Sequence, residues 1–394
     1  MKKHRVCVVS GSRADYGLLK NLIKLLKQDD SFDLKIAVTG PHLSPTWGET
    51  YREIERDGFT IDVKITTLLS SDEPAGMAKA LGLGVISFTD YFSFNRPDYV
   101  IVLGDRFEIL AAAQAAYCLK IPVVHLHGGE VTSGALDDYF RHAISKLASI
   151  HFVAHQLYAD RLIRMGEQPS SVFVSGALGI DQIANINGIS KPYIEQKLGL
   201  KLWDKYFLIV DHPTTAAIDD VVKEQEVVKN IYNALESYIE YQLIVSLANA
   251  DPRGYSINKA WKEIAAQNGG ERIKLFYHFG SELYLGLISH AQALIGNSSS
   301  GILEVPYFHK PTVNIGHRQD GRFHASSVVN TGSESKDIKA AIEKAIDINW
   351  QKESCLTVKN PFGEPGTVAK KILAKLKEIN LETFIYKEFY DLKP

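Results

Sequence analysis

A run of ionisable side chains follows an apolar stretch in the segment VVHLHGGEVTSGALDD, residues 123–138. His127 and Glu130 flank a pair of glycines, and Asp137 and Asp138 follow in the same segment. Carboxylates and an imidazole grouped in this way can exchange protons with a substrate, because mutual repulsion and burial move their pKa values apart. A polar loop is the competing interpretation, and Asp138 in particular suits a solvated charge at the start of a helix.

A further carboxylate, Asp105, ends the apolar run YVIVLGD at residues 99–105. If this run and residues 122–128 form neighbouring parallel strands, their carboxyl ends lie at the same edge of one sheet. We therefore predict a proton-transferring site at that edge, built from Asp105, His127, Glu130 and Asp137. Arg106 directly follows Asp105 and is a candidate for binding an anionic group of the substrate.

Hydroxyl and amide side chains follow another apolar run, in GNSSSG at residues 296–301. Asn297, Ser298 and Ser299 precede a short helical pattern, where backbone N–H groups and hydroxyls can bind phosphate. A serine-rich helix cap explains the hexapeptide equally well. Glu304, a few residues later, suits recognition of ribose hydroxyls.

Arginines and histidines supply the remaining candidates for binding an anion. Arg13 in GSRAD and Arg318 in GHRQDGR each follow a glycine closely, and a planar guanidinium can bind a diphosphate at two points. Surface salt bridges are the alternative for both. The histidines that follow other apolar runs are candidates for substrate binding, and the middle one also for catalysis: His42, His212 and His278.

The positions of these residues depend on an alternation of strand-like and helix-like segments. Apolar runs predict strands at residues 5–11, 34–40, 99–105, 122–128, 150–155 and 172–176, and again at 206–213, 241–248, 273–279, 293–298 and 311–316. These runs do not alternate polar with apolar residues, which is typical of parallel strands covered on both faces. We predict an α/β fold of two Rossmann-like, doubly wound domains, residues 1–178 and 179–365, with a cleft between them. A helix within residues 366–394 is expected to pack back on the first domain.

Length and composition restrict the class of protein. A chain of 394 residues favours two domains, and 45% hydrophobic with 23% charged residues indicates a soluble globular protein. A net charge of −2 gives no electrostatic case for nucleic-acid binding, and no apolar run approaches the roughly 20 residues that span a bilayer. The start of the chain has no signal-peptide pattern and the three cysteines form no CxxC unit, so we expect a cytoplasmic protein with no metal site.

Several motifs together resemble those of one known family, the hydrolysing UDP-N-acetylglucosamine 2-epimerases: GSRADYGLL, LGDRFEILAAA, HLHGGEVTSGALDD, DHPTT, IGNSSSG and GHRQDGR. The resemblance covers most of residues 1 to about 380 and implies the two-domain fold of the B-type nucleotide-sugar glycosyltransferases. It also implies hydrolysis of UDP-N-acetylglucosamine to N-acetylmannosamine and UDP without a cofactor, in the synthesis of sialic acid-type sugars. A bacterial subgroup acts instead on a UDP-linked 2,4-diacetamido-2,4,6-trideoxy sugar, for legionaminic acid.

Roles for individual residues also follow from this resemblance. It implies that Asp105 and Asp137 are catalytic, and that a UDP site contains Arg13, His212, Ser298, Ser299, Glu304 and Arg318. Animal members have a glutamate in place of His127, so our hypothesis is that His127 transfers a proton while Glu130 orients it. Glu130 as the transferring group is the alternative.

The resemblance further implies a homodimer or homotetramer. Two other classes of function stay open from the sequence: a glycosyltransferase of the same fold that uses a UDP-sugar, and a nucleotide-sugar sensor without catalysis. Asp105 and Asp137 argue against the sensor, which could dispense with both.

Overall fold

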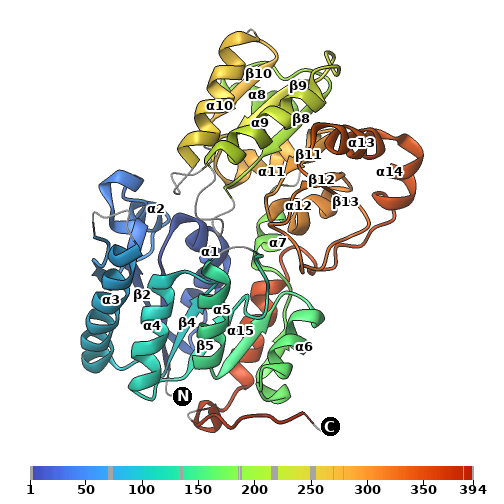
Figure 1. Ribbon diagram of the computed structural model, residues 1–394. Coiled ribbons are helices and arrows are strands. Elements are labelled where there is room, and N and C mark those ends of the chain that lie inside the picture. Colours follow the sequence, from blue (N-terminus) through green and yellow to red (C-terminus); the bar gives the residue numbers. More distant parts are fainter. Residues whose placement is uncertain are drawn as a thin grey trace. The chain divides into compact units, whose positions relative to one another are not determined.

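The computed structural model describes residues 3–69, 74–133, 136–184, 186, 189–213, 221–248, 254–268, 270–277, 279–384 and 386–392. The chain divides into two compact units (Figure 1). Unit 1 comprises Met1–Glu130, Asp137–Asp181 and Phe362–Pro394, and unit 2 comprises Val131–Leu136 and Gln182–Pro361.

Unit 1 is built on a seven-stranded parallel sheet with the order β3-β2-β1-β4-β5-β6-β7. The strands are β1 (His4–Ser10), β2 (Phe32–Thr39), β3 (Val63–Ile65), β4 (Tyr99–Leu103), β5 (Val123–Leu126), β6 (Ile150–Val153) and β7 (Val172–Val174). The helices are α1 (Arg13–Gln28), α2 (Tyr51–Arg56), α3 (Pro74–Asn95), α4 (Phe107–Cys118), α5 (Leu136–Leu147), α6 (Gln156–Arg164) and α15 (Val368–Glu378), with α7 (Leu178–Ile183) where the chain leaves the unit. The strand order reverses between β1 and β4, which is where ligands bind in doubly wound sheets.

Both faces of this sheet are buried. Val6 and Val8 of β1 point into one apolar cluster, whereas Cys7 and Val9 point into the cluster on the other face. Successive side chains of a strand alternate between faces, so a strand covered on both sides must be apolar throughout. The strand segments of the sequence therefore lack alternation because both faces of the sheet are covered, as we expected.

The end of the chain completes the core of unit 1. Ile372 and Leu376 of α15 are buried in the same cluster as Leu19 and Leu22 of α1. Figure 1 shows α15, in red, among the blue and green elements of that unit. Each buried aliphatic side chain of this size contributes roughly 1.5–3 kcal/mol of hydrophobic stabilisation, so α15 is an integral part of the unit.

Unit 2 repeats the plan with a six-stranded parallel sheet of order β10-β9-β8-β11-β12-β13. The strands are β8 (Tyr206–Val210), β9 (Gln242–Ser246), β10 (Ile273–Phe276), β11 (Ala293–Gly296), β12 (Thr312–Ile315) and β13 (Val328–Thr331). The helices are α8 (Lys191–Leu198), α9 (Val221–Leu235), α10 (Gly254–Gln267), α11 (Ser281–His290), α12 (Ser300–Leu303), α13 (Ser335–Ile346) and α14 (Ile348–Ser354). Short 3₁₀ turns occur in both units. Unit 1 contains η1 (Gly40–Leu43), η2 (Pro45–Trp47), η3 (Pro169–Ser171) and η5 (Leu381–Phe384), and unit 2 contains η4 (Val305–Phe308). The strand order of this sheet reverses between β8 and β11.

The predicted fold class, two doubly wound α/β halves, is confirmed, and each predicted strand is present. Two strands were missed, β3 and β13, and both lie at an edge of their sheet. Each has only one buried residue, Ile65 in β3 and Val328 in β13. Edge strands this short carry too little apolar sequence to stand out from a loop.

Candidate functional site

Charged side chains gather in unit 1 at the point where its strand order reverses. Asp15 follows β1, Asp105 and Arg106 follow β4, and Asp137 lies in the first turn of α5, which follows β5. These four groups are close enough to influence one another electrostatically. The edge predicted from the sequence therefore does bring Asp105, Arg106 and Asp137 together.

Glu108 forms the floor of this cluster. Its side chain is fully buried, and Oε1 accepts a hydrogen bond from Nε of Arg106 at 2.5 Å. A Cβ added to Gly11 or Gly40 would lie 2.9 Å from the Glu108 side chain, so both loops need glycine to pass over it. Because a buried carboxylate requires a countercharge, Glu108 holds Arg106 at the carboxyl ends of β1 and β2.

Arg141 of α5 connects the carboxylates that follow β4 and β5. Its guanidinium is almost fully buried, and it forms an ion pair with Oδ2 of Asp105 and lies 3.4 Å from Oε2 of Glu130. Arg141 stands one helical turn after Asp137, so the two side chains occupy the same face of α5. This arginine orients Asp105 and Glu130 from one rigid element.

Two carboxyl groups of the cluster have raised pKa values. Burial, followed by the negative charge of Asp105, raises the pKa of Asp137 to about 6. Burial also raises the pKa of Asp15 to about 7, although the positive charge of Arg106 opposes this. Groups that titrate near neutrality can both hold and release a proton under physiological conditions, as acid–base catalysis requires.

The HGGE turn after β5 has a strained backbone that the two glycines make possible. His127 has a φ of 62°, in the left-handed region that residues other than glycine rarely adopt. A Cβ added to Gly129 would lie 2.5 Å from the carbonyl oxygen of Tyr158, and one added to Gly128 would lie 2.9 Å from Ser145 Oγ. The glycines therefore let this turn pack closely against α5 and α6.

Both ring nitrogens of His127 have partners inside unit 1. The backbone N–H of Leu178 donates to Nε2 at 3.1 Å, so Nε2 is the acceptor nitrogen of the ring. Nδ1 must then carry the proton, and it donates to Oε1 of Glu130 at 2.7 Å. The ring is buried. This arrangement favours a positioning role for His127 over the proton transfer of our hypothesis.

His125 lies in β5, two residues before His127, and holds the ends of neighbouring elements together. Its Nε2 contacts the carbonyl oxygen of Gly104 at 2.8 Å, and its Nδ1 contacts Ser145 Oγ at 3.0 Å. Burial lowers the pKa of His125 to about 3, so the ring is neutral. It thus ties the end of β4, directly before Asp105, to β5 and α5.

Two residues predicted to bind the substrate, Arg13 and His42, have side chains that contact other groups of unit 1. Arg13 is partly exposed and forms an ion pair with Glu53 at 3.0 Å. His42 is fully buried, and its ring contacts Ser10 Oγ at 2.9 Å and Thr50 Oγ1 at 2.8 Å. Burial lowers the pKa of His42 to about 4.

Asp138 lies in the first turn of α5, 3.6 Å from His142 on the same helix. This position matches the alternative interpretation of Asp138 as a charge at the start of a helix.

Unit 2 presents a different chemistry at its own reversal of strand order. The Asn297 side chain accepts the backbone N–H of His212 at 2.8 Å and donates to the His212 carbonyl oxygen, also at 2.8 Å. Gln319 and Arg318 donate to the carbonyl oxygen of Asn297 at 2.7 and 3.2 Å. The loops after β8, β11 and β12 are thereby joined into one rim.

Hydroxyl groups line the loop after β11. Ser298 Oγ lies 2.9 Å from Ser300 Oγ, which also contacts the hydroxyl of Tyr284 in a short hydrogen bond. A Cβ added to Gly296 would lie 2.0 Å from the Val210 carbonyl oxygen, so this glycine is required by the contact of β11 with β8. Ser299 precedes α12, a single turn of helix, and half-buried Glu304 ends it.

Burial shifts the pKa values of His212 and Asp211, in the loop after β8, towards their neutral forms. Burial, followed by the positive charge of Arg318, lowers the pKa of His212 to about 4. Burial, followed by the charge of Glu224, raises the pKa of Asp211 to about 7. His278 and the threonines of DHPTT, Thr214 and Thr215, lie outside the described residues.

Several residues at these two sheet edges were not singled out from the sequence: Asp15, Glu108, Arg141, Asp211 and Gln319. All are charged or polar and almost fully buried. Burial is not visible in a single sequence. Asp15, Glu108, Asp211 and Gln319 lie in polar segments that follow predicted strands, and Arg141 follows Asp137 by one helical turn, so position along the chain was the available signal.

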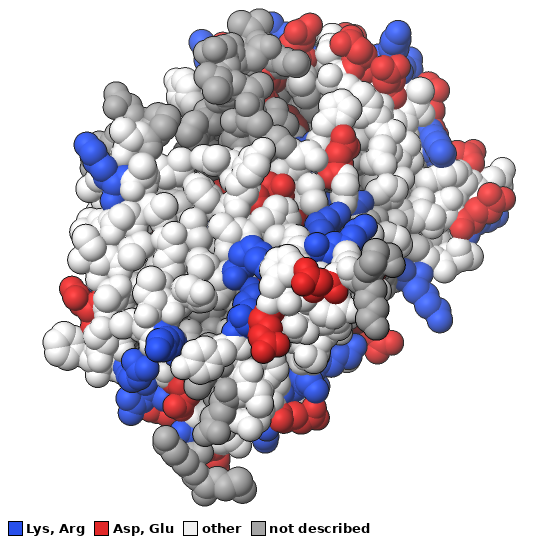
Figure 2. Space-filling model, turned by 60° about the horizontal axis from the view of Figure 1, so that its bottom comes forward, with Lys and Arg blue, Asp and Glu red and all other residues white. Residues whose placement is uncertain are grey.

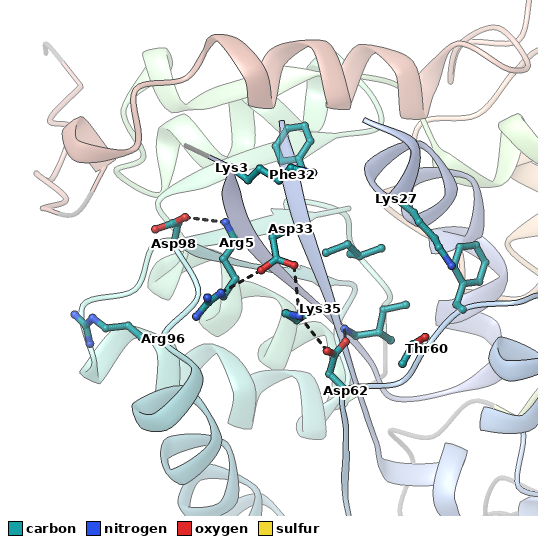
Figure 3. Close-up of a pocket in the computed structure, with 13 residues that line it drawn as sticks. Lys3, Arg5, Lys27, Phe32, Asp33, Lys35, Thr60, Asp62, Arg96 and Asp98 are labelled. Atoms are coloured by element: carbon teal, nitrogen blue, oxygen red, sulfur yellow. Dashed lines mark hydrogen bonds and ion pairs between the residues drawn. The ribbon is translucent and has the colours of Figure 1, made fainter. Parts of the chain in front are cut away.

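A separate hollow of about 800 Å³ lies at the amino ends of β1, β2 and β4 (Figure 3). Its charged side chains are engaged with one another: Asp33 lies 3.3 Å from Arg5 and 3.4 Å from Lys35, which is also 3.4 Å from Asp62. Ligands in parallel sheets bind at the carboxyl ends of strands. This hollow is therefore at the wrong edge for the chemistry described above.

In the described part of the chain, no three His, Cys, Asp or Glu side chains gather as the ligands of a metal ion would. No helix there is long and apolar enough to cross a membrane.

Comparisons with known proteins show the family of the chain. A family model described as UDP-N-acetylglucosamine 2-epimerase matches residues 24–377. The GDP/UDP-N,N'-diacetylbacillosamine 2-epimerase (hydrolyzing) of Campylobacter jejuni is 40% identical over 392 residues, which cover 100% of both chains. The UDP-N,N'-diacetylbacillosamine 2-epimerase (hydrolyzing) of Legionella pneumophila is 35% identical over 382 residues, 97% of each chain.

A solved structure shares the fold. The UDP-GlcNAc 2-epimerase from Neisseria meningitidis, bound to UDP-GlcNAc, superposes with a TM-score of 0.80 at 18% identity, covering 95% of this chain and 100% of that one. Taken with the family model, these likenesses define the class. The chain belongs to the UDP-N-acetylglucosamine 2-epimerase family, in its hydrolysing branch, and is an enzyme.

Proposed function

We propose that the protein hydrolyses UDP-N,N'-diacetylbacillosamine, which is UDP-2,4-diacetamido-2,4,6-trideoxyglucose, with inversion at C2 of the sugar. Support for this substrate comes from the Campylobacter and Legionella relatives, which are 40% and 35% identical over nearly the whole chain. UDP-N-acetylglucosamine is the second candidate, because a Neisseria meningitidis relative named UDP-N-acetylglucosamine 2-epimerase is 32% identical over 347 residues. Either product would supply cytoplasmic synthesis of sialic acid-type sugars.

The observation that carries the reaction is the pair of carboxyl groups in unit 1. Arg141 holds Asp105 by an ion pair, whereas burial raises the pKa of Asp137 to about 6. Two carboxyl groups with such different environments are suited to act as base and acid in one reaction. We assign the base to Asp105 and the acid to Asp137.

Asp105 takes the proton from C2 while the bond from C1 to the diphosphate oxygen breaks, giving a glycal and UDP. Asp137 gives its proton to C2 on the opposite face, and water adds to C1. The water loses a proton that restores Asp137, and the proton on Asp105 is released to solvent. Because the configuration at C2 inverts, removal and return of the proton require two groups.

Glu130 and His127 support this pair. The Nδ1–H of His127 fixes Glu130, and the same carboxylate lies 3.4 Å from Arg141. We propose that Glu130 helps to keep Arg141 in place and contacts the sugar, and that His127 positions Glu130. This modifies the hypothesis drawn from the sequence, in which His127 itself moved the proton.

Unit 2 supplies groups for the nucleotide. Asn297, Ser298 and Ser299 offer amide and hydroxyl donors at the carboxyl end of β11, and Arg318 offers positive charge beside them. Glu304 is the proposed partner of the ribose hydroxyls. His212 is neutral at physiological pH and can donate an N–H to a phosphate oxygen.

Product analysis tests the proposal. The protein would be incubated, without any acceptor, with UDP-N,N'-diacetylbacillosamine, its GDP analogue or UDP-N-acetylglucosamine, and free sugar would be identified by NMR. We expect the 2-epimeric free sugar, with kcat/KM about tenfold or more in favour of the diacetamido substrate, since a site that hydrogen-bonds an amide discriminates against its absence. No free sugar from any substrate would overturn the reaction. A preference for UDP-N-acetylglucosamine would overturn only the substrate.

A further inference from the structure

A chain of three hydroxyl groups runs from α11 to the loop after β11 in unit 2 (Figure 1). The hydroxyl of Tyr284 on α11 contacts Ser300 Oγ in a short hydrogen bond, and Ser300 Oγ lies 2.9 Å from Ser298 Oγ. Both serine side chains are buried, and Tyr284 is partly buried. Because Ser298 is a proposed donor to the nucleotide, the chain links that donor to a separate helix.

The phenol of Tyr284 is the donor at one end of this chain. A phenol is a stronger acid than an aliphatic alcohol, so it gives its hydrogen to a serine hydroxyl more readily than it accepts one. Burial raises the pKa of Tyr284 above its ordinary value, so the phenol keeps its proton at physiological pH. Among the residues that the structure describes, its hydrogen-bond partners are the two serine hydroxyls. A reversed chain would leave the phenolic hydrogen without an acceptor, which is unfavourable away from water.

Ser298 then receives two hydrogen bonds from Ser300. The Ser300 hydroxyl accepts the hydrogen of Tyr284 and donates its own to Ser298 Oγ, and the backbone N–H of Ser300 donates to the same oxygen at 3.3 Å. A serine hydroxyl has one hydrogen and two acceptor sites. With both acceptor sites filled, Ser298 can only donate. Such a hydroxyl suits an anionic oxygen and disfavours a group that must itself donate.

Uncharged donors are important for anion binding here because the protein has little positive charge. Its net charge is −2. On the face drawn in Figure 2, Lys and Arg side chains lie among Asp and Glu side chains with uncharged surface between them, so that face has no broad positive field. Affinity for a diphosphate therefore depends on donors that are held in a fixed direction.

We propose that Tyr284 is a positioning residue for UDP, because it fixes the direction of the hydroxyl chain and so points the hydrogen of Ser298 at a phosphate oxygen. This inference rests on the proposed function, in which Ser298 binds the nucleotide. Tyr284 acts through Ser300 and need not touch the ligand. Without the phenol, Ser300 Oγ has a free acceptor site, and the hydrogen of Ser298 can turn to it instead of to the phosphate.

Calorimetric titration with UDP tests this role. In Tyr284→Phe the Kd for UDP should rise about fivefold, which is the effect of a single hydrogen bond. The matched control is Tyr206→Phe, because the hydroxyl of Tyr206 also donates to α11, to the carbonyl oxygen of Leu287 at 2.6 Å. That bond has no link to Ser298, so the control should lower the Tm but leave the Kd for UDP within about 1.5-fold of wild type.

The dependence on Ser298 separates positioning from a structural effect. In a Ser298→Ala background there is no hydroxyl to redirect, so adding Tyr284→Phe should change the Kd for UDP by less than about 1.5-fold. A purely structural role of Tyr284 would give the same loss in both backgrounds. Thermal unfolding establishes that each variant is folded at the temperature of the titration.

Three results would each overturn the role of Tyr284 alone: wild-type affinity in Tyr284→Phe, an equal loss with and without the Ser298 hydroxyl, or a loss in Tyr206→Phe as large as that in Tyr284→Phe. Failure of the proposed function is distinguishable from these results. If the wild-type protein does not bind UDP, or if Ser298→Ala binds it normally, the nucleotide site fails and this inference fails with it.

Discussion

The two units reverse their strand order in the same way, yet the side chains at the reversal differ in kind. In unit 1 the loops after β1 and β4 end in charges, with Asp105 and Arg106 set among buried carboxylates. In unit 2 the loop after β11 carries an amide and hydroxyls, those of Asn297 and Ser300, and the loop after β8 carries Asp211, a buried carboxyl whose pKa is raised to about 7, beside neutral His212. One backbone plan thus carries two kinds of site.

The side chains at each edge determine which task that edge can perform. Proton transfer needs groups whose pKa values are moved towards neutrality, and burial among like charges moves them. Binding a diphosphate needs fixed donors that stay uncharged or positive, and reciprocal hydrogen bonds to the backbone hold such donors in place. We therefore expect changes in unit 1 to reduce turnover and changes in unit 2 to reduce nucleotide affinity.

The largest expected effect is that of Asp137→Asn. The amide keeps the shape of the side chain but has no proton to give to C2, so kcat should fall about 10³-fold. The adjacent change Asp138→Asn is the control and should stay within about threefold of wild type, because Asp138 lies 3.6 Å from His142 of the same helix. Steady-state kinetics with the preferred substrate measure both. Equal losses in the two variants would show that the start of α5, and not Asp137, matters.

Replacement of buried Arg141 should have the next largest effect, which is on the free energy of unfolding. Arg141→Met leaves Asp105 and Glu130 without their shared countercharge, which should lower the free energy of unfolding by about 3–5 kcal/mol. Arg164→Met, at an exposed position of α6, should change it by less than about 0.5 kcal/mol. Urea unfolding compares the two. A loss below 1 kcal/mol for Arg141→Met would mean that the pair with Asp105 is not a buried one.

The pH dependence of turnover distinguishes the acid from the base. If Asp137 must be protonated, activity is present below its pKa and lost as the pH rises through it. That pKa is about 6 in the free protein, and a bound diphosphate, being negative, raises it further. We expect log kcat to decline with a slope near −1 above a pKa of about 6 or higher. A kcat that instead rises through pH 6 to a plateau would assign the base to Asp137.

The smallest effect concerns His127 and separates positioning from proton transfer. Asparagine accepts a positive φ and places an amide N–H near Nδ1, so His127→Asn should keep kcat within about tenfold. Glutamine places its amide near Nε2, so His127→Gln should lose more. Loss of about 10³-fold in both variants would return the proton transfer to His127.

The fold and part of the site could be predicted from the sequence because apolar runs alternate with helical patterns along the chain, and polar residues follow the ends of those runs. Uninterrupted apolar runs marked the strands, and the ends of those runs marked Asp105, Glu130 and Asn297. The roles of Asp15 and Arg141 could not be predicted, because they depend on burial and on a partner from another element. For Arg13 the sequence position after a glycine predicted binding of a diphosphate, whereas in the structure its guanidinium forms an ion pair with Glu53 on α2.

Calorimetric titration with UDP tests the division of labour most directly, with Asp105→Asn compared against Asn297→Ala. Asp105→Asn should bind UDP within about threefold of wild type while losing about 10³-fold in kcat. Asn297→Ala removes the amide that joins the loops after β8 and β11, so its Kd for UDP should rise at least about tenfold, with kcat at saturation changed much less. If both variants lose affinity and turnover together, the two edges do not perform separate tasks and the account is contradicted.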